Sequence, residues 1–361
     1  MLNSLQAFRG LAAIGVVLHH TNIGIFSLEK YFGHRPLGCL VDFAYAGVDF
    51  FFVLCGFIML HVHADEIGQP RALGSYLWKR FSRIYLLYWV VLAVVATVFF
   101  VAPHFGTGVE RDPAVILRNI VLFPFPYPEY ALILGVAWTL VYEILFYLLF
   151  GLLILNKRLG VSVFVLWTCF VLAHRCFDAY PWNFLFSHHH IRFLAGMAVW
   201  LILHRWRVPV PRLVAGIGVT FFLAAGLVED FAGPMSPTSQ MICFTLGSAV
   251  TILGLVEAER SGLMRTPRCL VYLGDASYSI YLVHVLALSL IAKVSKSLQL
   301  DAHVPSLMLF SMHVVGAVGV GCPCHHVIEH PLHVWARRRL QRPRPVAIEE
   351  AAPGASIRKA A

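Results

Sequence analysis

The fold of this chain is decided by its first apolar stretch, LNSLQAFRGLAAIGVVLHHTNIGIF, which covers residues 2–26. The stretch is long and apolar enough to cross a bilayer as a helix, yet it carries Arg9, His19 and His20. A charged side chain inside a membrane helix costs ~2.5–3.5 kcal/mol on insertion scales, so such residues are rare and usually functional. The alternative interpretation is a snorkelling Arg9 and a hydrogen-bonded core histidine.

Arg9 and His20 are related by helical spacing. They are eleven residues apart, which at ~100° per residue returns them to nearly the same face of a helix, about 16 Å apart along its axis. This face is therefore predicted to hold a cation near one membrane surface and a titratable base near the other.

Composition indicates the class of protein. The chain has 361 residues, of which 59% are hydrophobic and only 13% are charged, and its mean hydropathy is +0.74. A soluble domain of this length does not need so many apolar residues, so the sequence predicts an all-α, polytopic integral membrane protein. Cationic cytoplasmic loops explain the net charge of +9 better than a nucleic-acid partner does. The eight cysteines form no C-x-x-C pair and are interpreted as small buried hydrophobes.

About ten transmembrane helices are predicted, together with one shorter apolar segment. The ten spans are 6–26, 46–63, 82–102, 137–155, 160–177, 190–204, 211–228, 238–256, 275–296 and 305–327. The shorter segment, 114–125, is interrupted by Arg118 and Asn119 and runs into three prolines. Because it is too short to span a bilayer comfortably, it is interpreted as re-entrant or interfacial.

The charges of the loops orient these helices. With the N-terminus inside, the inner loops hold more cations than the outer loops, namely Arg71, Lys79, Arg80, Lys157, Arg158, Arg205, Arg207, Arg212, Arg260, Arg265 and Arg268. This bias predicts that both termini are cytoplasmic, and counting 114–125 as a full span would reverse every later loop. The sequence thus predicts one transmembrane domain over 1–335 and a basic, disordered cytoplasmic tail over 336–361.

Two titratable residues are expected at similar depth. His20 lies about six residues inside the outer end of the first span, and Glu143, in WTLVYEILFYLLF (138–150), lies about six residues inside the outer end of the fourth. A carboxylate beside an imidazole orients it and raises its basicity, as a general base requires. The alternatives are a structural hydrogen bond and an element of a proton relay.

A pair of arginines begins the third span, in WKRFSRIYLLYW (78–89). Arg80 and Arg83 are three residues apart and share a helix face. Paired guanidinium groups at a helix start suit phosphate, which they bind in a bidentate manner. The alternative is a positively charged flank that contacts lipid headgroups.

Other polar residues are assigned less specific roles. Asp49 is either functional or a carboxylate favoured by a helix N-terminus, and mid-membrane His284 is interpreted as a packing hydrogen-bond donor. His188–His190 are a poor chelate, so we expect no metal site there but an exposed polar turn, or a cationic rim for an acidic substrate. Cys55 lies in apolar surroundings that favour a neutral thiol. The chain contains no G-x-S-x-G elbow, P-loop, H-E-x-x-H or Rossmann fingerprint.

Six short motifs, in order along about 5–335, resemble those of the membrane acyltransferase-3 family, the bacterial integral-membrane O-acyltransferases. They are Arg-x10-His at Arg9 and His20, G-V-D-x-F-F-V-x-S-G-F at 47–57, Arg-x-x-Arg at Arg80 and Arg83, W-x-L-x-x-E-x-x-F-Y at 138–147, Y-S-I-Y-L-x-H at 278–284 and Glu-x-Pro at 329–331. The resemblance selects His20 over His19 and is closest to the exopolysaccharide-acetylating branch. Cys55 stands where a serine is usual, and Gln6 where many members have Asp.

The resemblance implies a reaction at the bacterial cytoplasmic (inner) membrane. An acyl group, acetyl by default, would pass from cytoplasmic acyl-CoA to a hydroxyl of a cell-surface, exported or lipid-linked carbohydrate. Arg80 and Arg83, assisted by Arg9, would meet the phosphates of acyl-CoA. His20, oriented by Glu143, would take the proton from the hydroxyl. Direct attack on the thioester and an acyl-enzyme relay both stay open.

Two other classes of function are compatible with intramembrane His, Glu and Arg residues. One is a proton-coupled transporter that exports a sugar or lipid intermediate. The other is an assembly factor for polysaccharide synthesis whose polar residues are structural. The sequence shows no internal repeat, which argues against the transporter. Activity that depends on an acyl donor distinguishes the enzyme from both.

Overall fold

The computed structural model describes residues 2–123 and 132–341, and within these ranges it contains helices and no strand. The long helices are α1 (Asn3–Thr21), α2 (Gly47–His63), α3 (Leu73–Val101), α5 (Trp138–Leu155), α6 (Lys157–Leu172), α8 (His189–Arg205), α9 (Pro211–Ala232), α10 (Pro237–Arg260), α12 (Ser277–Ser297) and α14 (Ser306–Cys324). The shorter ones are α4 (Pro113–Val121), α7 (Trp182–Leu185), α11 (Arg268–Asp275), α13 (Leu300–His303) and α15 (His330–Gln341). The predicted all-α class is confirmed.

Seven helices of the described chain are long and apolar enough to cross a membrane. They contain α2, α3, α5, α9, α10, α12 and α14. The other three predicted spans, those around α1, α6 and α8, are helical but are not among the seven. Helices α6 and α8 have only 16 and 17 residues, and α1 carries Arg9 and two histidines. The seven long helices are those of a multi-pass membrane protein.

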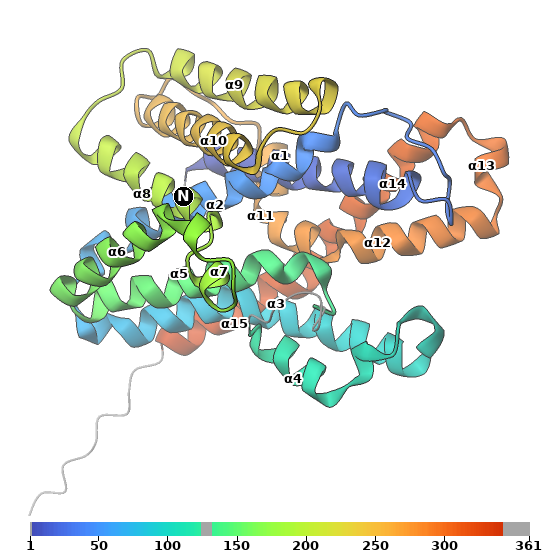
Figure 1. Ribbon diagram of the computed structural model, residues 1–361, viewed down its shortest axis with the longest axis horizontal. Coiled ribbons are helices and arrows are strands. Elements are labelled where there is room, and N and C mark those ends of the chain that lie inside the picture. The colour runs from blue at the N-terminus through green and yellow to red at the C-terminus, as the bar shows by residue number, and fades with distance from the viewer. Residues whose placement is uncertain (1, 124–131, 342–361) are drawn as a thin grey trace, which may run out of the picture.

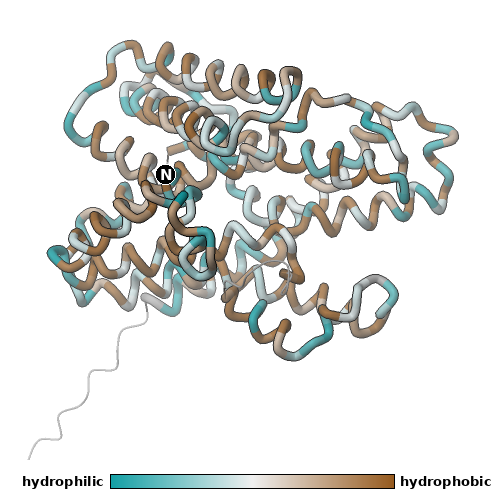
Figure 2. Tube along the Cα trace, viewed as in Figure 1, coloured by the Kyte–Doolittle hydropathy of each residue, from teal (hydrophilic) through white to brown (hydrophobic). Residues whose placement is uncertain are grey.

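The outer side of the bundle is apolar. Helix α9 exposes Leu213, Ile217, Phe221 and Val228, and hydrophilic residues gather in connecting segments such as the one between α8 and α9 (Figure 2). Such a surface would be unstable in water over this area, but it matches the acyl chains of a bilayer. The exposed apolar side chains therefore face lipid.

Helix α1 runs through the middle of the molecule and packs against α2, α10, α11, α12 and α14 (Figure 1). Glycine makes its contact with α11 possible. A Cβ atom on Gly10 would meet the backbone of Gly274, and a Cβ atom on Gly274 would meet the backbone of Gln6. Small residues let membrane helices approach closely, and this approach brings the polar side chains at the start of α1 next to the end of α11.

Helix α4 ends about halfway along α3. Three aromatic side chains of α3 donate hydrogen bonds to the last carbonyls of α4: Tyr85 to Val121 (2.9 Å), Tyr88 to Asn119 (2.9 Å) and Trp89 to Ile120 (2.8 Å). These donors lie 12–16 residues into α3, or about 18–24 Å from its start. A segment that stops at this level is consistent with the re-entrant interpretation of 114–125, of which residues 124–125 lie outside the described ranges.

The start of α1 and the last described helix are each held by hydrogen bonds to another helix. The backbone N–H groups of Asn3 and Ser4 donate to the carboxylate of Glu259 at the end of α10 (both 2.8 Å). The indole of Trp78, near the start of α3, donates to the Ala336 carbonyl of α15 (3.0 Å), and α3, α5 and α15 lie side by side (Figure 1). Helix α15 runs to Gln341, into the segment predicted as a tail, and the rest of that tail lies outside the described residues.

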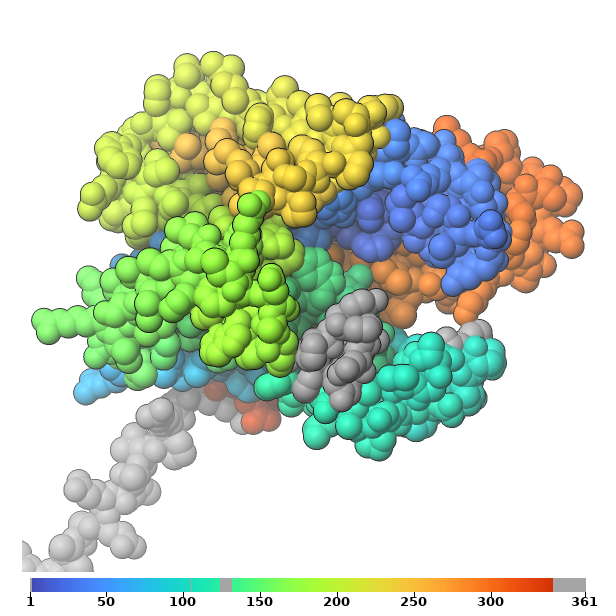
Figure 3. Space-filling view, viewed as in Figure 1, coloured from blue at the N-terminus to red at the C-terminus, as the bar shows by residue number. Residues whose placement is uncertain are grey.

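The opposite end of α1 is covered by the segment that follows it. Residues 27–41 lie over the ends of α12 and α14 (Figure 3). His34 forms a hydrogen bond with Ser306 at the start of α14, and the Lys296 ammonium lies 5.5 Å from the Phe32 ring centroid. The last turns of α1, which hold His19 and His20, are thereby enclosed on this side.

Candidate active site

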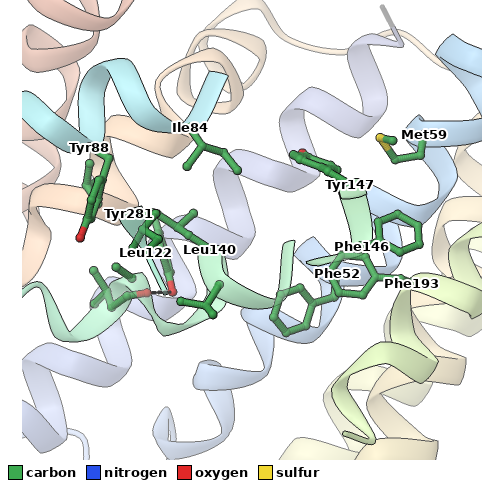
Figure 4. Close-up of a cluster of buried hydrophobic side chains, with 14 of the residues drawn as sticks. Phe52, Met59, Ile84, Tyr88, Leu122, Leu140, Phe146, Tyr147, Phe193 and Tyr281 are labelled. Carbon is green, nitrogen blue, oxygen red and sulfur yellow. Dashed lines mark hydrogen bonds between the residues drawn. The ribbon is translucent and has the colours of Figure 1, made fainter. Parts of the chain in front are cut away.

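A cavity of about 590 Å³ lies between α1, α2, α3, α5, α12 and α15. Its walls are largely apolar and aromatic, and Figure 4 labels five of the side chains that form them: Phe52, Ile84, Leu140, Tyr147 and Tyr281. Six basic side chains also line it: Arg9, Lys79, Arg80, Arg83, His333 and Arg337. An apolar cavity lined by four arginines and a lysine is suited to an anionic ligand that has a long uncharged part.

The two arginines of α3 contribute to this cavity with part of their hydrogen-bonding capacity unused. Arg80 bonds His63 of α2 and lies over the ring of Tyr147, with 5.4 Å from guanidinium carbon to ring centroid. Its Nε atom is buried and has no hydrogen-bond partner among the described residues. No hydrogen bond or salt bridge joins Arg83 to another described residue. Both groups can therefore bind an anion without first breaking an ion pair.

Arg9 reaches the cavity from α1. Its Nη1 atom donates to Oε1 of Gln6 at 2.7 Å, and the Gln6 amide donates to Asp275 of α11 at 2.5 Å. Gln6, which departs from the family pattern, thus links the arginine to a carboxylate on another helix. The guanidinium is held in place and keeps donors for a ligand.

Glu143 lines the same cavity from α5. Its Oε1 atom accepts a hydrogen bond from the Tyr147 hydroxyl, one turn further along the helix. The Cys55 thiol of α2 donates to the same oxygen at 3.7 Å. The carboxylate is therefore held by a neutral phenol and a neutral thiol in a cavity that is also lined by four arginines.

The structure does not bring His20 into contact with Glu143. The hydrogen bonds of His20 within the described chain go to the Val16 carbonyl (3.0 Å) and to Nε2 of His284 (3.2 Å). The direct contact between His20 and Glu143 was expected on the assumption that α5 starts at the outer surface. In the structure, α5 starts inside the bundle. The Tyr281 hydroxyl bonds both Val136 and Thr139 at that start (2.9 and 3.0 Å), only four residues into α12. Glu143 therefore lies further from the outer membrane surface than His20 does.

Asp49 forms a buried ion pair. It contacts Arg192 of α8, and both side chains are almost completely buried. Nη1 of Arg192 also contacts Nδ1 of His189 at 3.1 Å. This pair joins α2 to α8, so the structure favours a packing role for Asp49.

The three consecutive histidines are not the exposed turn that we expected. His189 and His190 begin α8, and His190 is fully buried with its Nε2 atom 3.1 Å from the Phe184 carbonyl. His190 packs against aromatic side chains such as Trp167, with 4.8 Å between the two ring centroids. No group of three or more potential metal ligands occurs in residues 2–123 and 132–341.

Asp49→Ala is expected to destabilise the protein strongly. Removing one partner of a buried ion pair leaves the other charge unpaired, which typically costs about 3–5 kcal/mol. Thermal unfolding of the purified protein in detergent measures the loss. The double variant Asp49→Ala/Arg192→Leu is the control and should recover most of the stability. A single variant as stable as the wild type would contradict the packing role.

Several residues of the cavity were not identified from the sequence. Lys79 was predicted only as a loop residue, Arg337 lay in the predicted tail, and His333 was given no role. His333 and Arg337 reach the cavity because α15 packs on α3. Tyr147 could have been found, because it follows Glu143 by four residues and so shares its helix face. His284 could not be linked to His20 by spacing, since they are 264 residues apart in the chain.

Comparison with known proteins identifies the family of the chain. Residues 2–326 match the family model of the acyltransferase-3 domain, described as an acyltransferase domain. The exopolysaccharide production protein ExoZ of Rhizobium meliloti is 28% identical over 329 residues, which cover 86% of this chain and 94% of the relative. Acyltransferase MdmB of Streptomyces mycarofaciens is 26% identical and covers 96% of this chain and 94% of its own.

A shorter match is protein 2 in the picA locus of Rhizobium radiobacter, 33% identical over 96 residues, which are 26% of this chain and 44% of the relative. No solved structure matches the chain significantly. The family model spans nearly the whole of the helical bundle described above, including α1, α3, α5 and α12. The chain therefore belongs to the acyltransferase-3 family and is a membrane O-acyltransferase.

Proposed function

We propose that this protein transfers an acyl group, acetyl in the first instance, from acyl-CoA to a hydroxyl of a cell-surface or exported carbohydrate. It does so within the bacterial cytoplasmic membrane. The observation that carries the proposal is the cavity that joins six basic side chains to an aromatic interior containing Glu143. The relative named for exopolysaccharide production supports a carbohydrate as acceptor.

The basic side of the cavity is suited to the phosphates of the donor. The start of α3 and helix α15 lie on the side that the positive-inside rule assigns to the cytoplasm, where acyl-CoA is made. Arg80, Arg83 and Arg9 offer guanidinium donors, and the buried Nε of Arg80 has no partner in the described chain. The aromatic interior accommodates the pantetheine arm and presents the thioester to the centre of the bundle.

His20 is proposed as the general base. The thioester supplies an activated acyl carbon. His20 removes the proton of the acceptor hydroxyl, the oxygen forms the new ester bond, and the carbon–sulfur bond breaks to release CoA as a thiolate that is then protonated. A base that acts in this way contributes ~10²–10⁴-fold to the rate.

Glu143 is proposed to act with His20 across the substrate and not through a direct hydrogen bond. Its negative charge would stabilise the imidazolium that forms on His20, since charges interact strongly where water is excluded. It also holds Tyr147 at the wall of the cavity. In this proposal His20 is the base and Glu143 is its counter-charge, and the two side chains approach the reactants at different levels of the bundle.

The function is tested first in cells. The acetyl content of surface polysaccharide is measured in a deletion strain and after complementation with the wild-type gene. Loss and recovery of acetyl groups would support the proposal. Unchanged acetylation in the deletion strain would contradict it for this acceptor. Substrate export by vesicles in the absence of acyl-CoA would instead favour a transporter.

Arg80→Ala is expected to weaken donor binding. A hydrogen bond to a charged group is worth about 1.5–3 kcal/mol, so the KM for acetyl-CoA should rise about 10- to 100-fold while the KM for the carbohydrate stays the same. Radiolabelled acetyl-CoA and polysaccharide from the deletion strain provide the assay in membrane vesicles. Arg338→Ala is the matched control, because Arg338 belongs to α15 but does not line the cavity. An unchanged KM for acetyl-CoA would exclude the phosphate role.

A further inference from the structure

His284 lies in direct contact with His20, although the proposed reaction assigns it no part. It has no exposed surface and projects from α12 toward α1. Its Nδ1 atom is 2.6 Å from the Tyr281 carbonyl oxygen, and its Nε2 atom is 3.2 Å from Nδ1 of His20. The two ring centroids are 4.9 Å apart. Both nitrogens of His284 are therefore engaged, one with its own helix and one with His20.

These contacts determine which nitrogens carry hydrogen. A carbonyl oxygen only accepts, so Nδ1 of His284 must be the N–H that donates to Tyr281. The neutral ring then has a lone pair on Nε2, which can only accept from His20. Nδ1 of His20 must in turn carry a hydrogen, and this agrees with its second contact, the Val16 carbonyl at 3.0 Å. The Nε2 atom of His20 is left with its lone pair.

We infer that His284 is a positioning residue, which holds the His20 ring by a hydrogen bond so that Nε2 of His20 is the nitrogen that accepts the hydroxyl proton. The inference rests on the proposed role of His20 as base. It gives His284 a function that its burial in the core does not require, because a packing residue needs no lone pair directed at another imidazole.

The same contact serves the transition state. When Nε2 of His20 takes the proton, the positive charge spreads over the ring and the Nδ1–H bond becomes more polar. That bond points at the lone pair of His284 and at the Val16 carbonyl, and such hydrogen bonds strengthen in a low-dielectric interior. His284 thus contacts Nδ1 of His20 in the way that the third member of a catalytic triad contacts and orients the triad histidine. Here the orienting group is a neutral imidazole.

A matched pair of variants separates the hydrogen bond from packing. Glutamine and methionine have unbranched side chains of similar length, but only the glutamine amide oxygen is a strong acceptor. In vesicles with radiolabelled acetyl-CoA and polysaccharide from the deletion strain, His284→Met should lower kcat at least about tenfold and leave the KM for acetyl-CoA within about twofold. His284→Gln should keep most of the kcat that the methionine variant loses. If the methionine variant does not accumulate, His284→Leu makes the same comparison with glutamine.

His313→Met is the control for the loss of a buried histidine. His313 in α14 is also fully buried and bonds a carbonyl of its own helix, Leu309 at 2.7 Å, but it contacts neither His20 nor the cavity. Its kcat should match the wild type. Equal rates for the glutamine and methionine variants of His284 would overturn the inference. His20→Ala is measured in parallel, so that failure of this inference can be told apart from failure of the proposed base. An inactive His20→Ala with a fully active His284→Met rejects only the role of His284, whereas an active His20→Ala rejects the proposed base itself.

Discussion

His20→Ala is expected to abolish acyl transfer while the protein still accumulates in the membrane. The variant removes the base that takes the proton from the acceptor, and such a group is worth ~10²–10⁴-fold in rate. The side chain lies at the end of α1 and is only partly buried, so its truncation leaves a smaller cavity than a change in the core would. We expect the loss to appear in kcat, with an unchanged KM for acetyl-CoA.

The measurement is acetyl content of the surface polysaccharide in the deletion strain, complemented with His20→Ala. The control is His19→Ala, the adjacent histidine, whose Nδ1 atom is held by the Asp42 carbonyl at 2.7 Å. This variant should restore acetylation, since it is His20 and not His19 that forms the hydrogen bond with His284. Normal acetylation by His20→Ala would reject the base, and failure of both variants at normal protein level would leave no reason to prefer His20.

Glu143→Ala is expected to have the second-largest effect, a nearly complete loss of activity. It removes the carboxylate that lies among Arg9, Arg80 and Arg83 in the cavity and frees the hydroxyl of Tyr147. Three cations would then remain without this counter-charge in a region of low dielectric constant. The protonated form of His20 would also lose its proposed stabilisation.

Two further variants divide this effect between charge and positioning. Glu143→Gln keeps the size of the side chain and its acceptor oxygen but removes the charge, and Tyr147→Phe removes only the hydroxyl that Glu143 accepts. If the charge is the catalytic property, the glutamine variant should be about as inactive as the alanine variant, and the phenylalanine variant should be more active than either. The kcat of each of the three variants is measured in vesicles with acetyl-CoA and polysaccharide. A fully active Glu143→Gln would remove the carboxylate from the mechanism.

The sequence carried much of the architecture because the membrane imposes simple constraints. Apolar stretches of about 20 residues must be helical in a bilayer, and so the all-α class and the positions of the long helices follow from hydropathy alone. The spacing of Arg80 and Arg83 likewise places them on one helix face, and both line the cavity. The short, interrupted stretch after α3 is predicted from its length to be re-entrant or interfacial.

Depth and long-range contacts were decided only by the tertiary structure. Glu143 was expected beside His20 because hydropathy does not reveal that α5 starts inside the bundle, next to Tyr281. His284 meets His20, and Arg337 of α15 joins the cavity, through packing between helices that are far apart in the sequence. Periodicity determines the face on which a residue lies. The level at which two helices meet depends on close contacts such as that of Gly10 with Gly274, which no pattern within a single helix encodes.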